Sequence, residues 1–323
     1  MNRRTVVFVL KTAATVLILV VLAYRVDLDG LSSTLRGAPV APVVLGLLFG
    51  LVVMVVSGLR WRLISGQLRV PLPARFAVLG YMESICFNLI LPGSMAGDAL
   101  RVAKVTRARG HLRRNLAAVL FDRAANLGIL LALCIPASVL MWGKPGTENL
   151  LLVLGALAVI SLVAGCILVL SSRLRSLRRY RPVREMVYLS MMSYRFLFRG
   201  SGILSVGLLS LCVQFLAIAM LACAAASVGI VNLSALELAV ATLLALLAAA
   251  LPFTIAGFGL REGALIWTLE AYGIDSTRAL AAAVMFAAIL LLQSVPGLAI
   301  WLLGMAKLPR LPAGKSLSGR LSK

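Results

Sequence analysis

Apolar residues occur in eight runs along the chain, and short polar or basic stretches separate these runs. A run of about 20 apolar residues forms a helix long enough to cross the ~30 Å hydrocarbon core of a bilayer. Several runs reach that length, so the pattern predicts an all-α polytopic membrane protein. The runs cover residues 5–24, 40–58, 76–91, 116–142, 150–170, 202–228, 236–251 and 279–303.

The composition excludes a water-soluble globule. Hydrophobic residues make up 61% of the 323 residues and charged residues only 13%, whereas roughly 25% of residues are charged in ordinary soluble domains. The cysteines occur singly within apolar stretches, and His111 is the only histidine. A zinc or haem site that needs several histidines therefore cannot be built within this chain. We expect no metal and no cofactor.

The basic residues predict the orientation in the membrane. Lysine and arginine number 32 against 11 acidic residues, and they concentrate in alternate loops, which is typical of cytoplasmic loops. We expect a multi-pass protein of the cytoplasmic membrane with both termini in the cytoplasm. The run 5–24 also has features of a signal peptide, but a retained helix fits better. The basic segment 171–200 is typical of a surface helix on anionic lipid headgroups.

Two segments are predicted to enter the membrane and return. Basic stretches flank 76–91 on both sides, which places both of its ends in the cytoplasm. The apolar stretch after Pro252 has only about a dozen residues, too few to cross the bilayer, so 236–272 is expected to enter from outside. The predicted fold has about six full spans and two opposed re-entrant broken-helix hairpins.

An internal repeat relates the two broken segments. Residues 91–101 align with 251–261 at an offset of 160, and six of the eleven positions are identical. Combined with the topology, this alignment predicts an inverted repeat of the kind found in many secondary transporters. The alternative is that both motifs are only helix breaks. The halves are 1–142 and 143–304, followed by a disordered basic tail, 305–323.

The two breaks carry candidate anion sites. Non-helical backbone at membrane depth needs a polar cavity or protein to satisfy it. Helices that start near the two breaks would aim backbone N–H groups inward, and an arginine follows one turn later in each, which suits phosphate. An interfacial, snorkelling side chain is the alternative for the first arginine. The expected lipid-phosphate contacts are Arg101, Arg261, Ser94, Thr254, Gly97, Gly257 and Asn88.

The acidic residues do not follow the repeat. Asp98 aligns with Phe258, and Glu262 aligns with Val102. Acids inside membrane helices are costly, so they are candidates for function. For the adjacent Asp122 and Arg123, a structural ion pair is as well supported as a transport role. The expected coupling or ion-pair residues are Asp98, Glu262, Glu83, Asp122 and Arg123, whereas Asn126, Gln214 and Gln293 are expected to form interhelical hydrogen bonds.

These motifs resemble the transmembrane flippase domain of lysylphosphatidylglycerol synthetases, which also occurs as a stand-alone protein. The resemblance covers nearly the whole chain and implies translocation of a lipid across the cytoplasmic membrane. The soluble aminoacyl-transfer domain of the bifunctional members is not found in this sequence, so lipid aminoacylation is not expected. The matching segments are 88–93, 97–101, 122–123, 257–263 and 296–297.

The leading hypothesis is a lipid flippase that moves a phosphate-containing lipid, either a phospholipid or a polyprenyl-phosphate-linked lipid. The alternatives are a membrane enzyme acting on lipid phosphate, with Asp98, Glu262 or Asp122 as acid or base, and a non-transporting membrane scaffold. The expected partners are membrane lipids and no nucleic acid, and a homo-oligomer is compatible with this role.

Overall fold

A computed structural model describes residues 36–90, 95–140, 202–250 and 257–306, together with a few positions between 148 and 159. The first apolar run, the basic segment 171–200, the tail after Ala306, and the candidates Ser94 and Thr254 lie outside the described residues.

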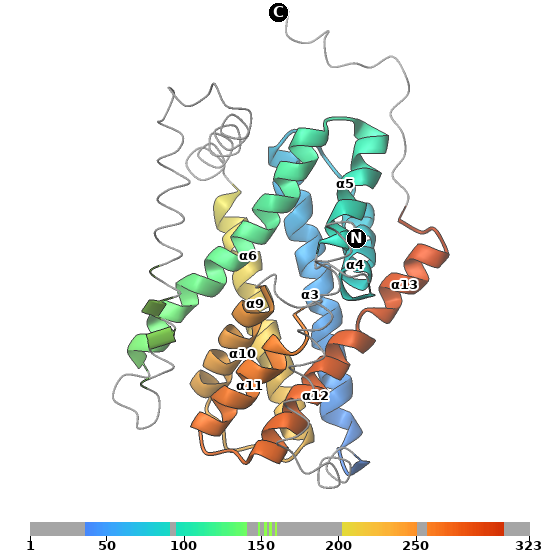
Figure 1. Cartoon of the computed structure of the whole chain (residues 1–323). Helices are drawn as coiled ribbons and strands as arrows, with labels where there is room; N and C mark the ends of the chain where they lie inside the picture. Colours follow the sequence, from blue (N-terminus) through green and yellow to red (C-terminus); the bar gives the residue numbers. More distant parts are fainter. Residues whose placement is uncertain are drawn as a thin grey trace, which may run out of the picture.

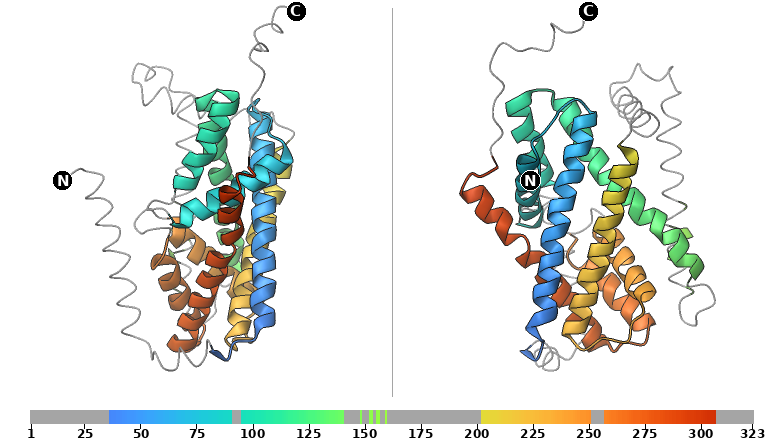
Figure 2. Two further views of the ribbon diagram at one scale, coloured as in Figure 1. Left: turned by 90° about the vertical axis from the view of Figure 1, so that its right-hand side faces the viewer. Right: turned by 180° about the vertical axis from the view of Figure 1, so that it is seen from behind.

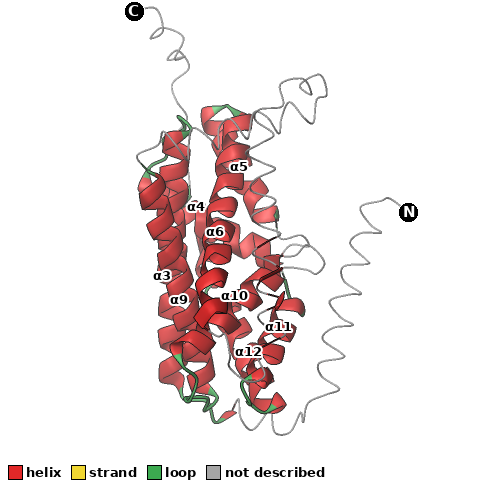
Figure 3. Ribbon diagram, turned by 90° about the vertical axis from the view of Figure 1, so that its left-hand side faces the viewer, coloured by secondary structure: helices red, strands yellow, loops and turns green. Residues whose placement is uncertain are grey.

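Within these ranges the chain is helical and has no strand (Figure 3). Four helical stretches are long and apolar enough to span a membrane, namely Val40–Gln67, Leu112–Ala137, Leu204–Ser227 and Ser276–Leu302. The predicted all-α, multi-pass membrane protein is therefore confirmed. The helices are α3 (Val40–Gln67), α4 (Ala74–Ile90), α5 (Ala96–Arg109), α6 (Leu112–Leu140), α9 (Ile203–Ser227), α10 (Ala235–Ala250), α11 (Leu260–Ala271), α12 (Ser276–Leu292) and α13 (Val295–Leu302).

Two helix boundaries differ from the prediction for physical reasons. The run expected to end at residue 58 continues to Gln67, because Trp61 and Ile64 extend the buried face of α3 past the first arginine. The run 279–303 is divided into α12 and α13, and Pro296 lies in the first turn of α13. Proline has no N–H to donate, so it is tolerated there and not in a helix interior.

The helices form an elongated bundle with a helical hairpin toward each end. The α4–α5 hairpin lies at one end, and the α10–α11 hairpin lies at the other (Figure 1). Between them α3 and α9 run side by side in opposite directions along the bundle (Figure 2). Apolar clusters join α9 to α12 at one end and α3, α4 and α6 at the other. The polar site described below lies between these clusters.

The α4–α5 hairpin depends on a close backbone contact at Gly97. A Cβ atom added to Gly97 would lie 1.8 Å from the carbonyl oxygen of Ser84. That distance is far below a van der Waals contact, and the obstructing atom belongs to the backbone of α4. Gly97 is therefore required for the spacing between these two helices.

We expect Gly97→Ala to lower the free energy of unfolding by about 1–3 kcal/mol, the usual cost of overpacking. The matched control is Gly128→Ala in α6, where an added Cβ meets no atom within 4 Å. Alanine is the better helix former, so this control should be neutral or stabilising by up to about 1 kcal/mol. Thermal melting in detergent compares the two variants, and equal melting temperatures would contradict the close contact.

Candidate functional site

A cavity of about 430 Å³ lies between α3, α4, α5, α6, α9 and α10. Its walls combine apolar side chains such as Val53 and Leu130 with many polar ones. A polar cavity among helices that span a membrane is a candidate path for a charged group. The polar and charged residues that line it are Ser57, Arg60, Tyr81, Ser84, Asn88, Asp98, Arg101, Asp122, Arg123 and Asn126.

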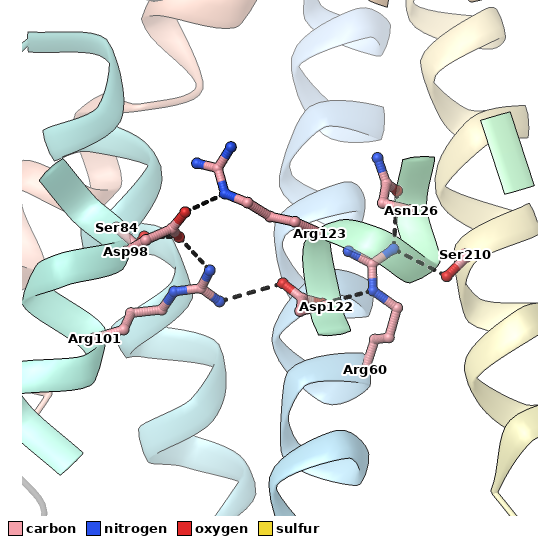
Figure 4. Close-up of polar contacts among 8 residues, drawn as sticks. All are labelled: Arg60, Ser84, Asp98, Arg101, Asp122, Arg123, Asn126 and Ser210. Atoms are coloured by element: carbon pink, nitrogen blue, oxygen red, sulfur yellow. Dashed lines mark hydrogen bonds and ion pairs between the residues drawn. The ribbon is translucent and has the colours of Figure 1, made fainter. Parts of the chain in front are cut away.

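Arg60 joins three helices beside this cavity. It projects from α3 and is 2% exposed. Its Nε donates to Oδ1 of Asp122 at 2.8 Å, and its Nη1 donates to Oδ1 of Asn126 at 2.9 Å and to Oγ of Ser210 at 3.2 Å (Figure 4). Asp122 and Asn126 belong to α6 and Ser210 to α9. Arg60 therefore fixes the position of the Asp122 carboxylate.

Arg101 of α5 points into the cavity and contacts two carboxylates. Its Nη1 donates to Oδ2 of Asp122 at 3.4 Å, and its Nη2 pairs with Oδ1 of Asp98. The guanidinium lies 4.6 Å from the ring centroid of Tyr81 and 4.9 Å from that of Trp61, both within cation–π range. Its Nε is buried and has no acceptor among the described residues. One donor of Arg101 thus has no described acceptor in this conformation.

Asp98 lies between two arginines in the first turn of α5. Its Oδ1 accepts from Arg101 and, at 3.4 Å, from Oγ of Ser84, and its Oδ2 accepts from Nε of Arg123 on α6. The position also suits a carboxylate because a helix N-terminus favours negative charge. Asp98 therefore bridges α5 and α6 across the cavity.

The polar residues form a chain of alternating charge, in the order Arg60, Asp122, Arg101, Asp98, Arg123 (Figure 4). The first four are buried, and the side chain of Arg123 is 40% exposed. Buried charges are tolerated only when they are paired, which the alternation achieves. These five described side chains carry three positive and two negative charges, so the chain of charges has a net charge of +1.

Comparison with protein families identifies the chain. A family model described as the lysylphosphatidylglycerol synthase TM region matches residues 8–297, nearly the whole sequence. The chain belongs to this family. A comparison with curated proteins finds no match. This member of the lysylphosphatidylglycerol synthase TM family is therefore a multi-pass membrane protein from a family connected with lipids.

Two predicted phosphate contacts of this family member bind each other. The N–H of Gly97 donates to Oδ1 of Asn88 at 2.8 Å, so the α4 side chain caps the start of α5. That N–H was expected to face a ligand, and in this conformation it is already used. Asn88 still lines the cavity. Glu83 is not among the described residues that line the cavity, and it pairs with Lys104 of α5.

The second predicted arginine forms a separate, local arrangement. Nε of Arg261 donates to Oε1 of Glu262 at 2.9 Å, and Oε2 of Glu262 accepts from the N–H of Gly259 at 2.7 Å. Glu262 therefore caps the start of α11 as well as pairing with Arg261. The guanidinium lies 5.0 Å from the ring centroid of Phe258. None of these described residues lines the cavity between α3, α4, α5, α6, α9 and α10. Gly257, which precedes them in the chain, has a φ of 77°.

Sequence reasoning identified Asp98, Arg101, Asp122 and Arg123 but missed Arg60, which it placed in a cytoplasmic loop. The available signal was helical spacing. The buried positions of α3 continue at intervals of three and four residues through Arg60, and their order is Gly46, Gly50, Met54, Ser57, Arg60, Ile64.

The hydrogen bonds expected of Asn126 and Gln214 are confirmed, because Nε2 of Gln214 donates to Oδ1 of Asn126 at 3.4 Å. This bond joins α9 to α6, next to the contact that Asn126 makes with Arg60. The side-chain amides therefore support the same polar layer that holds Asp122.

Proposed function

We propose that this protein moves a phosphate-containing lipid across the cytoplasmic membrane. The observation that carries the proposal is a cavity between membrane-spanning helices that is lined by Arg60, Arg101 and Arg123. The phosphate enters this cavity while the acyl or prenyl chains stay in the bilayer. Guanidinium groups replace the water that a phosphate would lose, which lowers the barrier to crossing.

The direct test uses purified protein in liposomes that contain a fluorescent phosphatidylglycerol. Dithionite bleaches the label in the outer leaflet only, so the bleached fraction reports exchange between leaflets. We expect bleaching beyond half of the label with protein and about half without it. Mass spectrometry of lipids that co-purify with the protein identifies the native ligand. Chemical conversion of the lipid without exchange would instead favour the membrane enzyme. If neither exchange nor conversion is observed, the non-transporting scaffold is favoured.

An inverted repeat explains how such a cavity is reached from both sides. The opposed hairpins and the antiparallel pair α3 and α9 support the pairing of the two halves (Figures 1 and 2). In this proposal the α4–α5 hairpin enters from the cytoplasm and the α10–α11 hairpin from outside. Rocking of one half against the other then exposes the cavity to each side in turn.

The proposed topology predicts opposite labelling of two positions, one just after each hairpin. His111 lies between α5 and α6, and Arg278 lies just after the α11–α12 connection; both are exposed. In a cysteine-free background, a cysteine at position 111 should react with a membrane-impermeant maleimide only from the cytoplasmic side. A cysteine at 278 should react only from outside. Labelling of both positions from one side of intact cells would contradict the inverted repeat.

The repeat also assigns a role to Arg261 in the opposite access state, with Glu262 as its counter-ion when no lipid is bound. We expect Arg261→Ala to weaken phospholipid binding by about 1.5–3 kcal/mol, the contribution of a charged hydrogen bond. Arg278→Ala, which removes an exposed arginine at the end of the bundle, is the matched control. Lipid titration of both variants in detergent decides the matter, and equal affinities would remove Arg261 from the binding site.

A further inference from the structure

We propose that the Asp98 carboxylate is a resident counter-ion that occupies the position of the lipid phosphate and leaves it when the lipid binds. The proposal rests on the lipid-transport function above and describes how the same cavity is regulated. The two aspartates that line the cavity, Asp98 and Asp122, differ in what holds them.

Asp122 is held by Arg60, whereas Asp98 is held mainly by the two arginines Arg101 and Arg123. Asp122 is 1% exposed and accepts from the buried Arg60 at 2.8 Å, and Arg60 is itself fixed by two further hydrogen bonds. Asp98 has no comparable anchor on α4, since its contact with Ser84 is 3.4 Å long. Its other bonds go to Arg101 and Arg123, the two side chains that a phosphate would contact. A phosphate that binds both arginines would therefore take the place of Asp98, whereas Asp122 would keep Arg60 even if it lost its 3.4 Å contact with Arg101.

The position of Asp98 also fits an exchange with an arriving ligand. Arg123 is 40% exposed and marks the accessible side of the charged chain, whereas Arg101 is buried at 3%. Asp98 lies between them (Figure 4). A phosphate that first meets Arg123 would reach Arg101 by taking the place of this carboxylate. The buried Nε of Arg101, which has no acceptor among the described residues, supplies an additional donor.

The charge of the cluster indicates the kind of headgroup. The charges of the five described side chains, with Asp98 included, sum to +1. A headgroup with one negative charge therefore neutralises the cluster while the displaced Asp98 stays ionised. A phosphodiester carries one such charge. Dioctanoyl phosphatidylglycerol is therefore the probe for the experiment.

The decisive variant is Asp98→Asn, and binding of the probe in detergent is measured by microscale thermophoresis. If the Asp98 carboxylate occupies the phosphate position in about 90% of lipid-free molecules, only about 10% of them can bind lipid. Removal of the carboxylate should then tighten binding about tenfold. The matched control is Glu83→Gln, which removes a negative charge one residue from Ser84 but outside the cavity lining. It should change the affinity less than twofold.

A loss of affinity in Asp98→Asn, or an equal gain in both variants, would overturn the proposal. The first result would make Asp98 a ligand contact, and the second would make the effect one of net charge alone. If Asp98→Asn does not fold, Ser84→Ala tests the same idea, because it frees Asp98 from its hydrogen bond on α4 and should tighten binding about twofold to threefold; no gain there is equally decisive. Lipid exchange by the wild type is measured in parallel. If the wild type does not exchange lipid, the proposed transport function fails, whereas the binding results test the role of Asp98 alone.

Discussion

Arg101→Gln is expected to reduce lipid exchange in proteoliposomes by at least about tenfold while the protein remains folded. Arg101 is the deepest arginine of α5, and a charged hydrogen bond to phosphate contributes about 1.5–3 kcal/mol, which is about 10- to 150-fold in affinity or rate. The fold should survive because each carboxylate that loses Arg101 keeps another partner, Arg60 for Asp122 and Arg123 for Asp98.

The matched control for this variant is Arg107→Gln, which changes an exposed arginine further along the same helix. It makes the same change in net charge, so a general electrostatic effect on anionic lipid would affect both variants. The dithionite assay at equal protein density compares them. If Arg101→Gln exchanged lipid as fast as Arg107→Gln and the wild type, the phosphate would not pass this arginine.

The four described spans and the separation of α4 from α5 were predictable because their signals are local. A long apolar run determines a membrane helix almost regardless of its neighbours. The break before Gly97 is local as well, and the residues that follow it, Asp98 and Arg101, both lie in the cavity. The multi-pass helical fold and these two side chains were accordingly identified from the sequence.

The partners of these residues were not predictable, because they depend on how distant helices pack. The bond from Arg60 to Ser210 joins residues 150 positions apart. Helical spacing continues the buried face of α3 through Arg60, but it does not show which residues of other helices Arg60 contacts. The adjacent Asp122 and Arg123 were considered as a pair, yet their ion pairs join Asp122 to Arg60 and Arg101, and Arg123 to Asp98. Neighbouring residues on a helix point in different directions.

The repeat shows a second limit of sequence reasoning. Arg101 and Arg261 occupy the same place in the aligned motifs, but Arg101 lines the cavity and Arg261 is paired with Glu262. An alignment of two motifs compares residue types and does not show which partners each side chain has. The asymmetric acids Asp98 and Glu262 now have different contacts, since Asp98 bridges two helices and Glu262 caps its own.

Arg60→Met should lower the free energy of unfolding by about 3–5 kcal/mol, the usual cost of breaking a buried ion pair. Asp122 is 1% exposed and would lose its shortest contact, and Ser210 and Asn126 would lose their shared donor. Unfolding in detergent measures the loss. Arg75→Met removes an exposed arginine at the start of α4 and should leave stability nearly unchanged.

The double variant Arg60→Met/Asp122→Leu shows whether the loss comes from the unpaired charge. A buried ion pair replaced by apolar groups of similar volume is often close to neutral, because the desolvation of both charges is avoided. We therefore expect the double variant to recover most of the stability that Arg60→Met loses, since Arg101 keeps Asp98 as a partner. Lipid exchange should nevertheless stay low, because Asp122 no longer helps to hold the Arg101 guanidinium between Tyr81 and Trp61. Recovery of exchange together with stability would mean that the Arg60–Asp122 pair serves the fold alone.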